Sequence, residues 1–433
     1  MLQAALDSGA ADRRAVFEVF ARHLPHGRRY GVVAGTGRLL DAIEKYRFGP
    51  AEIEFLRESR VVNEATLSYL ASYRFGGNIW GYAEGDVYFP GSPILVVEGT
   101  FGEAVLLETL LLSVLNHDCA VASAASRMVT AAGGRSLIEM GSRRTHESAA
   151  VAAARAAYIA GFGSTSNLAA RFVYGVPSGG TAAHAFTLVH DSEKDAFLAQ
   201  VSSLGRATTL LVDTFDVAAA VRSAVSVAGP SLGAVRVDSG DLAAVAFSVR
   251  SQLDSLGATD TRIILTGDLD EYSIAGLGVV PVDGYGVGTS LVTGSGAPTA
   301  ALVYKLVARS PGASDELQPV AKRSVGKPGR GGRKWPIREF GPDNLAVTER
   351  ILMDDPACGD RSASEGHSAS EDHSSRVLLR ELVRSGSVVG RESLAEARAR
   401  HASALAELPP YALQLSRGYP AIPTVFGRNG EEG

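Results

Sequence analysis

Four short apolar runs in the middle of the chain constrain the fold most strongly, because each one ends in aspartate or glycine. They are TLLVDTFD (209–216), GAVRVDSGD (233–241), RIILTGDLD (262–270) and VDGYGVGTS (282–290), with helical stretches between the first three. Alternating strands and helices predict a parallel sheet, whose buried strands are apolar on both faces. No GxGxxG motif opens a helix after the first strand, which disfavours an open dinucleotide-binding sheet. We therefore predict an α/β barrel with its site at the carboxyl ends of the strands.

The length of 433 residues exceeds what one hydrophobic core usually organises, so we expect a second, smaller domain. Residues 1–110 mix short strands and helices and predict the N-terminal part of a small α+β domain. Residues 111–305 are expected to form the barrel-like domain that carries the site, and a helical stretch over residues 101–132 introduces it. Residues 306–433 are expected to return to the small domain.

The C-terminal region changes character along its length. The segment AKRSVGKPGRGGRKWPIREF predicts a basic, solvated hairpin, and residues 354–376 predict a mobile loop rich in Ser, Asp, Glu and His. His367 and His373 in that loop could bind a metal, although solvated histidines are the simpler interpretation. A helix rich in Ala, Glu and Arg is expected after Arg391.

Charge and cysteine content exclude several classes of protein. Lys plus Arg is 42 against 47 Asp plus Glu, a formal charge of -5, so no general basic field attracts nucleic acid. Only Cys119 and Cys358 occur, which gives neither a disulfide framework nor a cysteine-based zinc site. The apolar stretch AVLLETLLLSVL is too short to span a bilayer, and no signal peptide is evident at the start. We expect a cytoplasmic protein without membrane or nucleic-acid partners.

Four aspartates follow three neighbouring strands of the predicted sheet: Asp213, Asp238, Asp241 and Asp268. Grouped carboxylates suit either the hydroxyl groups of a sugar or a hydrated Mg²⁺ that also binds substrate phosphates. Capping of the following helices is the alternative for any one of them.

Glycines and basic residues complete the predicted site. The sequence GYGVGTS, with Gly288 and Thr289, can form an anion nest from backbone N–H groups, although turn glycines often serve backbone geometry alone. Guanidinium groups match phosphate and carboxylate geometry. The candidate cations are Arg143, Arg144, Arg236 and Lys305. Together these residues predict a Mg²⁺-assisted site for a phosphorylated sugar.

His184 directly follows a run of small residues in SGGTAAH (178–184). A neutral imidazole is a nucleophile, and small neighbours leave room for a phosphate to approach it. A buried, hydrogen-bonded histidine and a purely structural bond to a strand end remain alternatives.

Five segments together resemble the nicotinate phosphoribosyltransferases, in the order in which that family carries them. They are GSRRTHESAAVAAARAAYIAGFGSTSN (141–167), SGGTAAH (178–184), RVDSGDL (236–242), TGDLDEYSI (266–274) and YGVGTSLVTG (285–294). The resemblance implies the irregular, TIM-like α/β barrel of the type II phosphoribosyltransferases, with a smaller α+β domain built from the N-terminal and C-terminal segments. It implies a homodimer with shared active sites.

The resemblance also implies a reaction. Nicotinate and 5-phosphoribosyl 1-pyrophosphate give nicotinate mononucleotide and pyrophosphate in NAD salvage, with Mg²⁺ as cofactor and coupled hydrolysis of ATP. His184 matches the histidine that the family phosphorylates. Thr181, Arg236 and Ser166 match positions around nicotinate, and Asp238 and Asp241 match catalytic and Mg²⁺-binding positions. The positions that match ribose and phosphate contacts are Arg143, Arg144, Asp213, Gly267, Asp268, Gly288, Thr289 and Lys305.

Ser166 is expected to select the acid over the amide, because the related nicotinamide enzyme carries an aspartate at this point. A carboxylate there would repel the carboxylate of nicotinate.

One feature of the family has no counterpart in this sequence. Family members begin with a segment close to TDxYELTM, whose tyrosine stacks on the pyridine ring, whereas this sequence begins MLQAAL. Either the start site is misassigned, or the protein has lost an aromatic contact worth ~1 kcal/mol or more. The missing segment motivates one alternative, a catalytically weak paralogue that acts as a binding or regulatory partner. The other alternative is quinolinate phosphoribosyltransferase, which shares the barrel. Quinolinate phosphoribosyltransferase needs a denser basic pocket and does not use a phosphorylated histidine, so the SGGTAAH motif argues against it.

Overall fold

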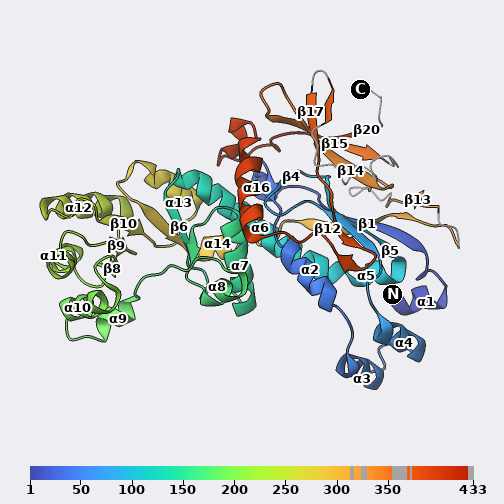
Figure 1. Cartoon of the computed structure of the whole chain (residues 1–433), viewed down its shortest axis with the longest axis horizontal. Helices are drawn as coiled ribbons and strands as arrows, with labels where there is room; N and C mark the ends of the chain where they lie inside the picture. Colours follow the sequence, from blue (N-terminus) through green and yellow to red (C-terminus); the bar gives the residue numbers. More distant parts are fainter. Residues whose placement is uncertain (313–315, 323–328, 354–367, 371–372, 428–433) are drawn as a thin grey trace. The chain divides into compact units, whose positions relative to one another are not determined.

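The computed structural model in Figure 1 describes residues 1–312, 316–322, 329–353, 368–370 and 373–427. The chain divides into two compact units. Met1–Ala120 and Thr299–Gly433 make one, which we call the terminal unit, and Val121–Pro298 makes the other, which we call the barrel unit. The limits expected from the sequence were residues 110 and 305. The first lies inside a single helix, α6 (Glu108–Ala132), whose apolar pattern continues unbroken through that point.

The terminal unit contains a seven-stranded sheet in the order β13-β12-β1-β5-β3-β18-β19. Its central strand, β1, pairs antiparallel with both β5 and β12. All but the first and seventh residues of β1 are buried, as expected for a strand covered on both faces. The strands are β1 (Arg14–Ala21), β3 (Asn78–Gly81), β5 (Pro93–Thr100), β12 (Leu302–Arg309), β13 (Gln318–Pro319), β18 (Arg380–Arg384) and β19 (Ser387–Val388).

The helices of the N-terminal segment lie in this unit, and Val105 of α5 and Leu111 and Leu115 of α6 belong to the same apolar core as the sheet. Thr100 begins α5 with a capping box in which Thr100 and Glu103 bond each other's backbone N–H groups. The helices are α1 (Leu2–Asp7), α2 (Thr36–Lys45), α3 (Pro50–Glu58), α4 (Glu64–Ser72) and α5 (Phe101–Leu106). None of the helices among the described residues combines the length and apolar character needed to cross a bilayer.

Two smaller sheets and one helix complete the terminal unit. The five-stranded sheet has the order β16-β17-β14-β15-β20, and β2 pairs with β4. Ser393 caps helix α16 (Leu394–Ala406), the C-terminal helix expected after Arg391. The strands are β2 (Gly31–Val32), β4 (Val87–Tyr88), β14 (Lys334–Phe340), β15 (Ala346–Met353), β16 (Ser368–Ser370), β17 (His373–Val377) and β20 (Thr424–Gly427).

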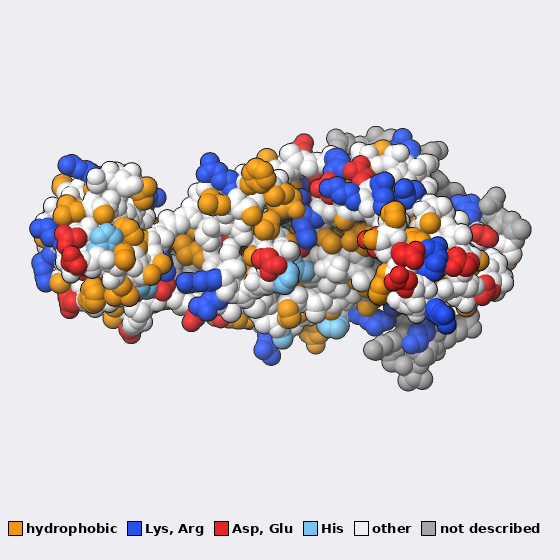
Figure 2. Space-filling view, turned by 90° about the horizontal axis from the view of Figure 1, so that it is seen from below, with side chains coloured by type: hydrophobic (Ala, Val, Ile, Leu, Met, Phe, Trp, Pro, Cys, Tyr) orange, Lys and Arg blue, Asp and Glu red, His pale blue; other side chains and the backbone are white. Residues whose placement is uncertain are grey.

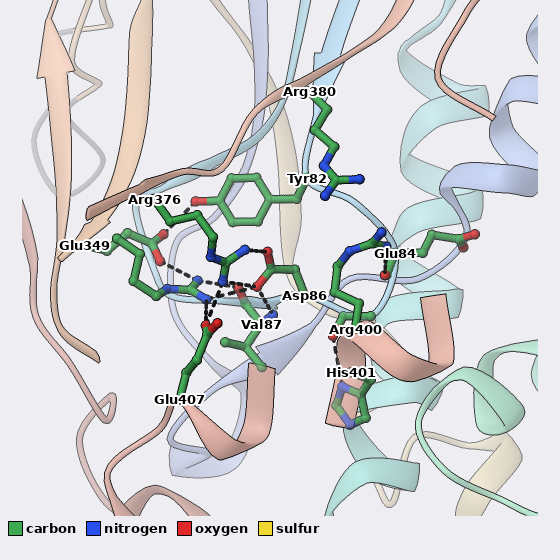
Figure 3. A network of polar contacts seen from close by, with 12 residues as sticks. Tyr82, Glu84, Asp86, Val87, Glu349, Arg376, Arg380, Arg400, His401 and Glu407 are labelled. Atoms are coloured by element: carbon green, nitrogen blue, oxygen red, sulfur yellow. Dashed lines mark hydrogen bonds and ion pairs between the residues drawn. The ribbon is translucent and has the colours of Figure 1, made fainter. Parts of the chain in front are cut away.

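A buried polar network joins the N-terminal and C-terminal segments (Figure 3). The guanidinium group of Arg338 donates to Asp86 at 2.9 Å and to Glu349 at 2.8 Å, and Arg376 donates to Asp86 and Glu407. Burial alone would raise the pKa of Asp86, but the charges of Arg338 and Arg376 hold that pKa well below its usual range. Removing one partner would leave a buried charge uncompensated, so the network fixes how these distant segments fit together.

Two expectations about the C-terminal region are wrong in part. The basic segment is not simply a solvated hairpin, because its end forms β14 and Lys334 makes a buried ion pair with Glu18 at 2.7 Å. Part of the predicted mobile loop forms strands β16 and β17, since Ser368–Ser370 pair with His373–Ser375. His367 lies outside the described residues, as does the rest of that loop before it.

The barrel unit is built on a six-stranded parallel sheet in the order β7-β6-β11-β10-β9-β8. The four predicted runs form β8, β9, β10 and β11, which lie side by side and pair in parallel, so this prediction is confirmed. Among the described strands no ladder joins β7 to β8, and the curled sheet is a half-barrel. The strands are β6 (Ser136–Glu139), β7 (Ser164–Thr165), β8 (Thr209–Leu211), β9 (Ala234–Val237), β10 (Arg262–Leu265) and β11 (Gly284–Val287).

Helices alternate with these strands, as the sequence pattern predicted. Residues of β9 and β11 are buried on both faces, and Val249 and Leu253 of α12 are buried beside the sheet. The helices are α7 (Glu147–Ile159), α8 (Leu168–Tyr174), α9 (His184–Leu188), α10 (Glu193–Leu204), α11 (Val217–Ala228), α12 (Leu242–Ser255), α13 (Glu271–Gly276) and α14 (Thr289–Val292).

The surface carries both signs of charge. Figure 2 shows basic and acidic side chains interspersed with apolar ones on one face, without a continuous basic area. This agrees with the formal charge of -5, and any anionic ligand must be held by local groups.

Candidate active site

A polar cavity of about 140 Å³ opens at the carboxyl ends of the strands in the barrel unit. Backbone atoms and side chains from the ends of β6, β9, β10 and β11 meet there, which is where parallel α/β folds place their ligands. The residues lining it are Met140, Arg143, Arg144, Arg236, Asp238, Thr266, Gly267, Asp268, Gly286, Gly288 and Thr289.

The aspartates after each strand divide into two kinds. A later aspartate caps the following helix: Asp216 accepts from Ala219 N, Asp241 from Ala244 N and Asp270 from Ser273 N. The earlier aspartate of each pair lies at the strand end and does not cap the helix. These are Asp213 after β8, Asp238 after β9 and Asp268 after β10. The capping alternative therefore describes Asp241, which is exposed and does not line the cavity.

Arg236 is the centre of the hydrogen bonding at the site. It lies on β9 and is buried, and its Nε donates to Thr266 Oγ1 at 2.8 Å. One terminal nitrogen donates to Thr181 Oγ1 at 2.7 Å and the other to Asp238 Oδ1 at 2.8 Å. The structure thus brings together Thr181 and Arg236, two of the three residues that the resemblance matched to positions around nicotinate.

Asp238 is stabilised as a carboxylate. Partial burial would raise its pKa, but hydrogen bonds from Thr266 and Arg236, and the nearby charge of Arg236, lower the pKa below its usual value. A carboxylate held this way accepts hydrogen bonds at neutral pH and is suited to a cation or to sugar hydroxyl groups.

His184 is connected to the cavity through Asp213. It is the first residue of α9, and its Nε2 lies 3.1 Å from Asp213 Oδ1. The side chain of Asp213 is 1% exposed, whereas that of His184 is 40% exposed. The other oxygen of Asp213 accepts from the backbone N–H of Asp238 at 2.8 Å and from Ser239 Oγ at 2.6 Å. The imidazole is therefore oriented by a buried acid and open to a ligand.

The space around His184 agrees with the interpretation of its small neighbours. A Cβ atom added at Gly180 would meet nothing within 4 Å, so this side of the segment is open. The purely buried alternative for His184 is excluded by its exposure.

Gly267 allows the loop after β10 to pass close to β9. It has φ +120°, and a Cβ atom there would lie 2.7 Å from the carbonyl oxygen of Asp238. Asp268 follows in the left-handed region at φ +47°. Only glycine accommodates both the conformation and the contact at residue 267.

Arg143 and Arg144 face the cavity without ion-pair partners among the described residues. Both are exposed and follow β6, beside Gly288 and Thr289 at the start of α14. Exposed guanidinium groups at an open cavity are suited to phosphate oxygens.

Ser166 and Lys305 do not line this cavity. Ser166 is exposed directly after β7, where its N–H donates to the carbonyl oxygen of Glu139 at 2.8 Å. Lys305 belongs to β12 of the terminal unit, opposite Glu18 in the register of β1.

The residues at the cavity fit a Mg²⁺ ion that binds mainly through substrate. Mg²⁺ typically takes one or two carboxylates, with phosphate oxygens and water completing its shell. Asp238 and Asp268 line the same cavity as the two arginines. No group of three or more His, Cys, Asp or Glu that could hold a metal occurs in the part of the chain that the structure describes.

Sequence reasoning missed three residues at the site. Thr266 bonds both Arg236 and Asp238, Met140 lines the cavity, and Glu139 is fully buried at the end of β6. The signal for Glu139 is an acidic residue that ends the apolar run SLIE immediately before the arginines.

A parallel half-barrel with this cavity at its strand ends is the fold of the type II phosphoribosyltransferases, which confirms the predicted class. Human nicotinic acid phosphoribosyltransferase superimposes with a TM-score of 0.81 at 25% identity, covering 99% of this chain and 96% of the human chain. The nicotinate-nucleotide pyrophosphorylase of Pyrococcus furiosus shares the fold at a TM-score of 0.74 and 22% identity, covering 94% and 92%.

The sequence comparisons define the family. Residues 1–116 match the family model of the nicotinate phosphoribosyltransferase N-terminal domain. Nicotinate phosphoribosyltransferase pncB1 of Mycobacterium tuberculosis is 56% identical over 432 residues, covering 98% of this chain and 92% of the relative. The enzyme of Bacillus subtilis is 36% identical, covering 69% and 63%. The chain belongs to the nicotinate phosphoribosyltransferase family.

Proposed function

We propose that this protein transfers the phosphoribosyl group of 5-phosphoribosyl 1-pyrophosphate to nicotinate, in NAD salvage in the cytoplasm. The observation that carries the proposal is the cavity in which Arg143 and Arg144, free of ion pairs among the described residues, face Asp238 and Asp268. Cations for phosphates and carboxylates for a sugar or Mg²⁺ are the groups that this substrate requires.

In the transfer step the pyridine nitrogen of nicotinate forms a bond to the anomeric carbon of the ribose. The bond from that carbon to the pyrophosphate oxygen breaks, and pyrophosphate leaves with the electron pair. No proton moves, because the nitrogen lone pair is already free. The arginines stabilise the negative charge that develops on the leaving group. Bound Mg²⁺ would add Lewis-acid stabilisation of the same phosphates, held by Asp238 and Asp268 or by Asp241 as the sequence suggested.

Nicotinate is proposed to bind near the pair formed by Thr181 and Arg236. Arg236 is buried and held by Thr266 and Asp238, so its position is fixed before substrate arrives. A fixed guanidinium group is suited to the carboxylate of nicotinate. Ser166, on the exposed segment after β7, is proposed to favour the acid because it adds no negative charge.

His184 is proposed to couple the transfer to ATP. A carboxylate only accepts hydrogen bonds, so the contact with Asp213 places the proton on Nε2 and leaves the lone pair on Nδ1. Nδ1 then attacks the γ-phosphorus of ATP, the bond to the bridging oxygen breaks, and ADP leaves. Water later hydrolyses the phosphohistidine to histidine and phosphate.

A homodimer is proposed from the apolar face of α8. Phe172 is 91% exposed and Leu168 70% exposed, although they are large apolar side chains of the barrel unit. Such exposure marks contact surfaces. Sedimentation of the purified chain tests this: a dimer is expected, and Phe172→Asp should shift it to monomer.

The reaction itself is tested by incubating the purified chain with 5-phosphoribosyl 1-pyrophosphate, Mg²⁺ and either nicotinate, nicotinamide or quinolinate. Nicotinate mononucleotide from nicotinate alone is the expected product. Product from quinolinate would favour the quinolinate enzyme, and no product from any acceptor would favour a binding or regulatory role.

A further inference from the structure

Glu139 is a fully buried carboxylate at the end of β6, between two loops of the barrel unit. One carboxylate oxygen accepts from the backbone N–H of Gly141, and the other accepts from the hydroxyl group of Thr165. The first contact lies at the start of the segment that carries Arg143 and Arg144. The second lies directly before Ser166.

The backbone and neighbouring side chains continue the same connection. The carbonyl oxygen of Glu139 accepts from Ser166 N at 2.8 Å, and Thr165 Oγ1 accepts from Asn167 N at 2.9 Å. The side-chain amide of Asn167 donates to Ser142 Oγ at 2.9 Å, so the two loops also touch directly. Three hydrogen bonds to Glu139, one from Asn167 to Thr165 and one between Asn167 and Ser142 therefore fix both segments to the end of β6.

Glu139 has no ion-pair partner among the described residues. Burial accordingly raises its pKa, while the hydrogen bonds from Thr165 and Gly141 oppose that rise. A buried acid without a cation is costly to a fold. An apolar residue would serve the core equally well, so the two hydrogen bonds are what this side chain supplies.

We propose that Glu139 is a positioning residue that couples the two substrate subsites: it holds the arginine segment and the Ser166 segment in one geometry. The inference rests on the proposed function for the identity of the ligands. Pyrophosphate bound by Arg143 and Arg144 restrains the segment of residues 140–144. Through Glu139 that restraint reaches residues 165–167, where nicotinate is selected.

Three variants separate this role from general stability. Glu139→Ala removes both side-chain bonds. Glu139→Gln retains them, because its oxygen accepts from Gly141 N–H while its amide donates to Thr165 Oγ1. Glu349→Gln is the matched control, since Glu349 is equally buried but belongs to the terminal unit, where it accepts from Arg338 and Tyr82.

Steady-state kinetics give the first readout. In Glu139→Ala the KM for 5-phosphoribosyl 1-pyrophosphate should rise about tenfold, and the preference for nicotinate over nicotinamide should fall by a similar factor. Glu139→Gln should remain within about threefold of wild type in both. Glu349→Gln should lower the melting temperature without changing the KM for 5-phosphoribosyl 1-pyrophosphate or the preference for nicotinate.

Hydrogen exchange gives a second readout that does not need activity. In the wild type, inorganic pyrophosphate should slow amide exchange in residues 140–144 and also in 165–167. In Glu139→Ala the second protection should disappear. The proposal would be overturned if Glu139→Gln lost the protection of residues 165–167 as fully as Glu139→Ala does. It would also be overturned if pyrophosphate still protected residues 165–167 in Glu139→Ala. An inactive wild type that still shows the coupled protection would instead overturn the proposed reaction.

Discussion

The carboxylate of Asp213 holds the imidazole of His184 at 3.1 Å, and its second oxygen holds the backbone of Asp238 at 2.8 Å. One buried acid thus ties His184, the proposed nucleophile, to the strand end that lines the cavity. His184 precedes Asp213 by 29 residues, and Asp213 in turn reaches Asp238 because β8 and β9 are neighbours.

This relationship predicts the effect of Asp213→Asn. An amide has one accepting oxygen, so when the N–H of Asp238 keeps that oxygen, the amide NH2 faces Nε2 of His184 and the lone pair no longer lies on Nδ1. A hydrogen bond to a charged group is worth about 1.5–3 kcal/mol, so ATP-stimulated turnover should fall about tenfold or more. Turnover measured with and without ATP checks this. Ser239→Ala, which removes only one donor to Asp213, is the control and should have a smaller effect. An unchanged ATP response in Asp213→Asn would contradict the role of Asp213.

Ser166→Asp tests the selection of acid over amide. The added carboxylate should repel nicotinate and offer nicotinamide an acceptor, so the ratio of kcat/KM for the two should move toward nicotinamide by about tenfold. In the control Ser166→Asn the new side chain is as large as aspartate but uncharged, so the ratio of kcat/KM should shift less. The assignment of Ser166 fails if both variants discriminate as the wild type does.

Gly267→Ala tests the close approach of the loop after β10. A Cβ atom would lie 2.7 Å from the carbonyl oxygen of Asp238, at a φ of +120° that alanine rarely adopts. Displacement of Asp238 should raise the KM for 5-phosphoribosyl 1-pyrophosphate about tenfold or more. Gly257→Ala is the control, because it also has positive φ but meets nothing within 4 Å. A normal KM in Gly267→Ala would show that the loop does not position Asp238.

The buried His401 should make the stability of the terminal unit sensitive to acid. Burial in α16 lowers the pKa of His401 from 6.5 to about 4, despite its hydrogen bond to the carbonyl oxygen of Gly85. The unfolded chain therefore binds the proton first, and stability is lost as the pH falls from 6.5 toward 4. A shift of this size corresponds to about 3 kcal/mol.

His401→Gln keeps a hydrogen-bond donor but does not titrate. Urea unfolding of both proteins from pH 7.5 to pH 4 should show a steeper decline in the wild type over that window. If the free energy of unfolding declined equally in the two proteins as the pH falls, this would contradict the neutral, buried state of His401.

The parallel strands and the grouping of acids at their ends could be predicted from the sequence, because both follow from local patterns. A strand end followed by two aspartates is such a pattern, yet it does not reveal which aspartate caps the helix. That depends on loop length, and here the later residue does so after each of β8, β9 and β10.

Tertiary contacts explain what the sequence did not predict. The segment ending in WPIREF is basic, but it forms β14, where Lys334 pairs with the buried Glu18 of β1 and Arg338 pairs with the buried Asp86 directly before β4. Glu139 is one acid in an apolar run, and its distant partner, Thr165 of β7, lies beside it because β6 and β7 pair. Charge pattern alone cannot predict such partners.

The measurement that bears most directly on the account is product formation with γ-labelled ATP. Wild-type protein given nicotinate, 5-phosphoribosyl 1-pyrophosphate and Mg²⁺ should form nicotinate mononucleotide and pyrophosphate in equal amounts, faster with ATP, and should carry label on His184. His184→Ala should lose the label and the ATP stimulation while a slow transfer persists. ATP stimulation or labelling that survives in His184→Ala, or a wild type that makes no mononucleotide, would contradict the account.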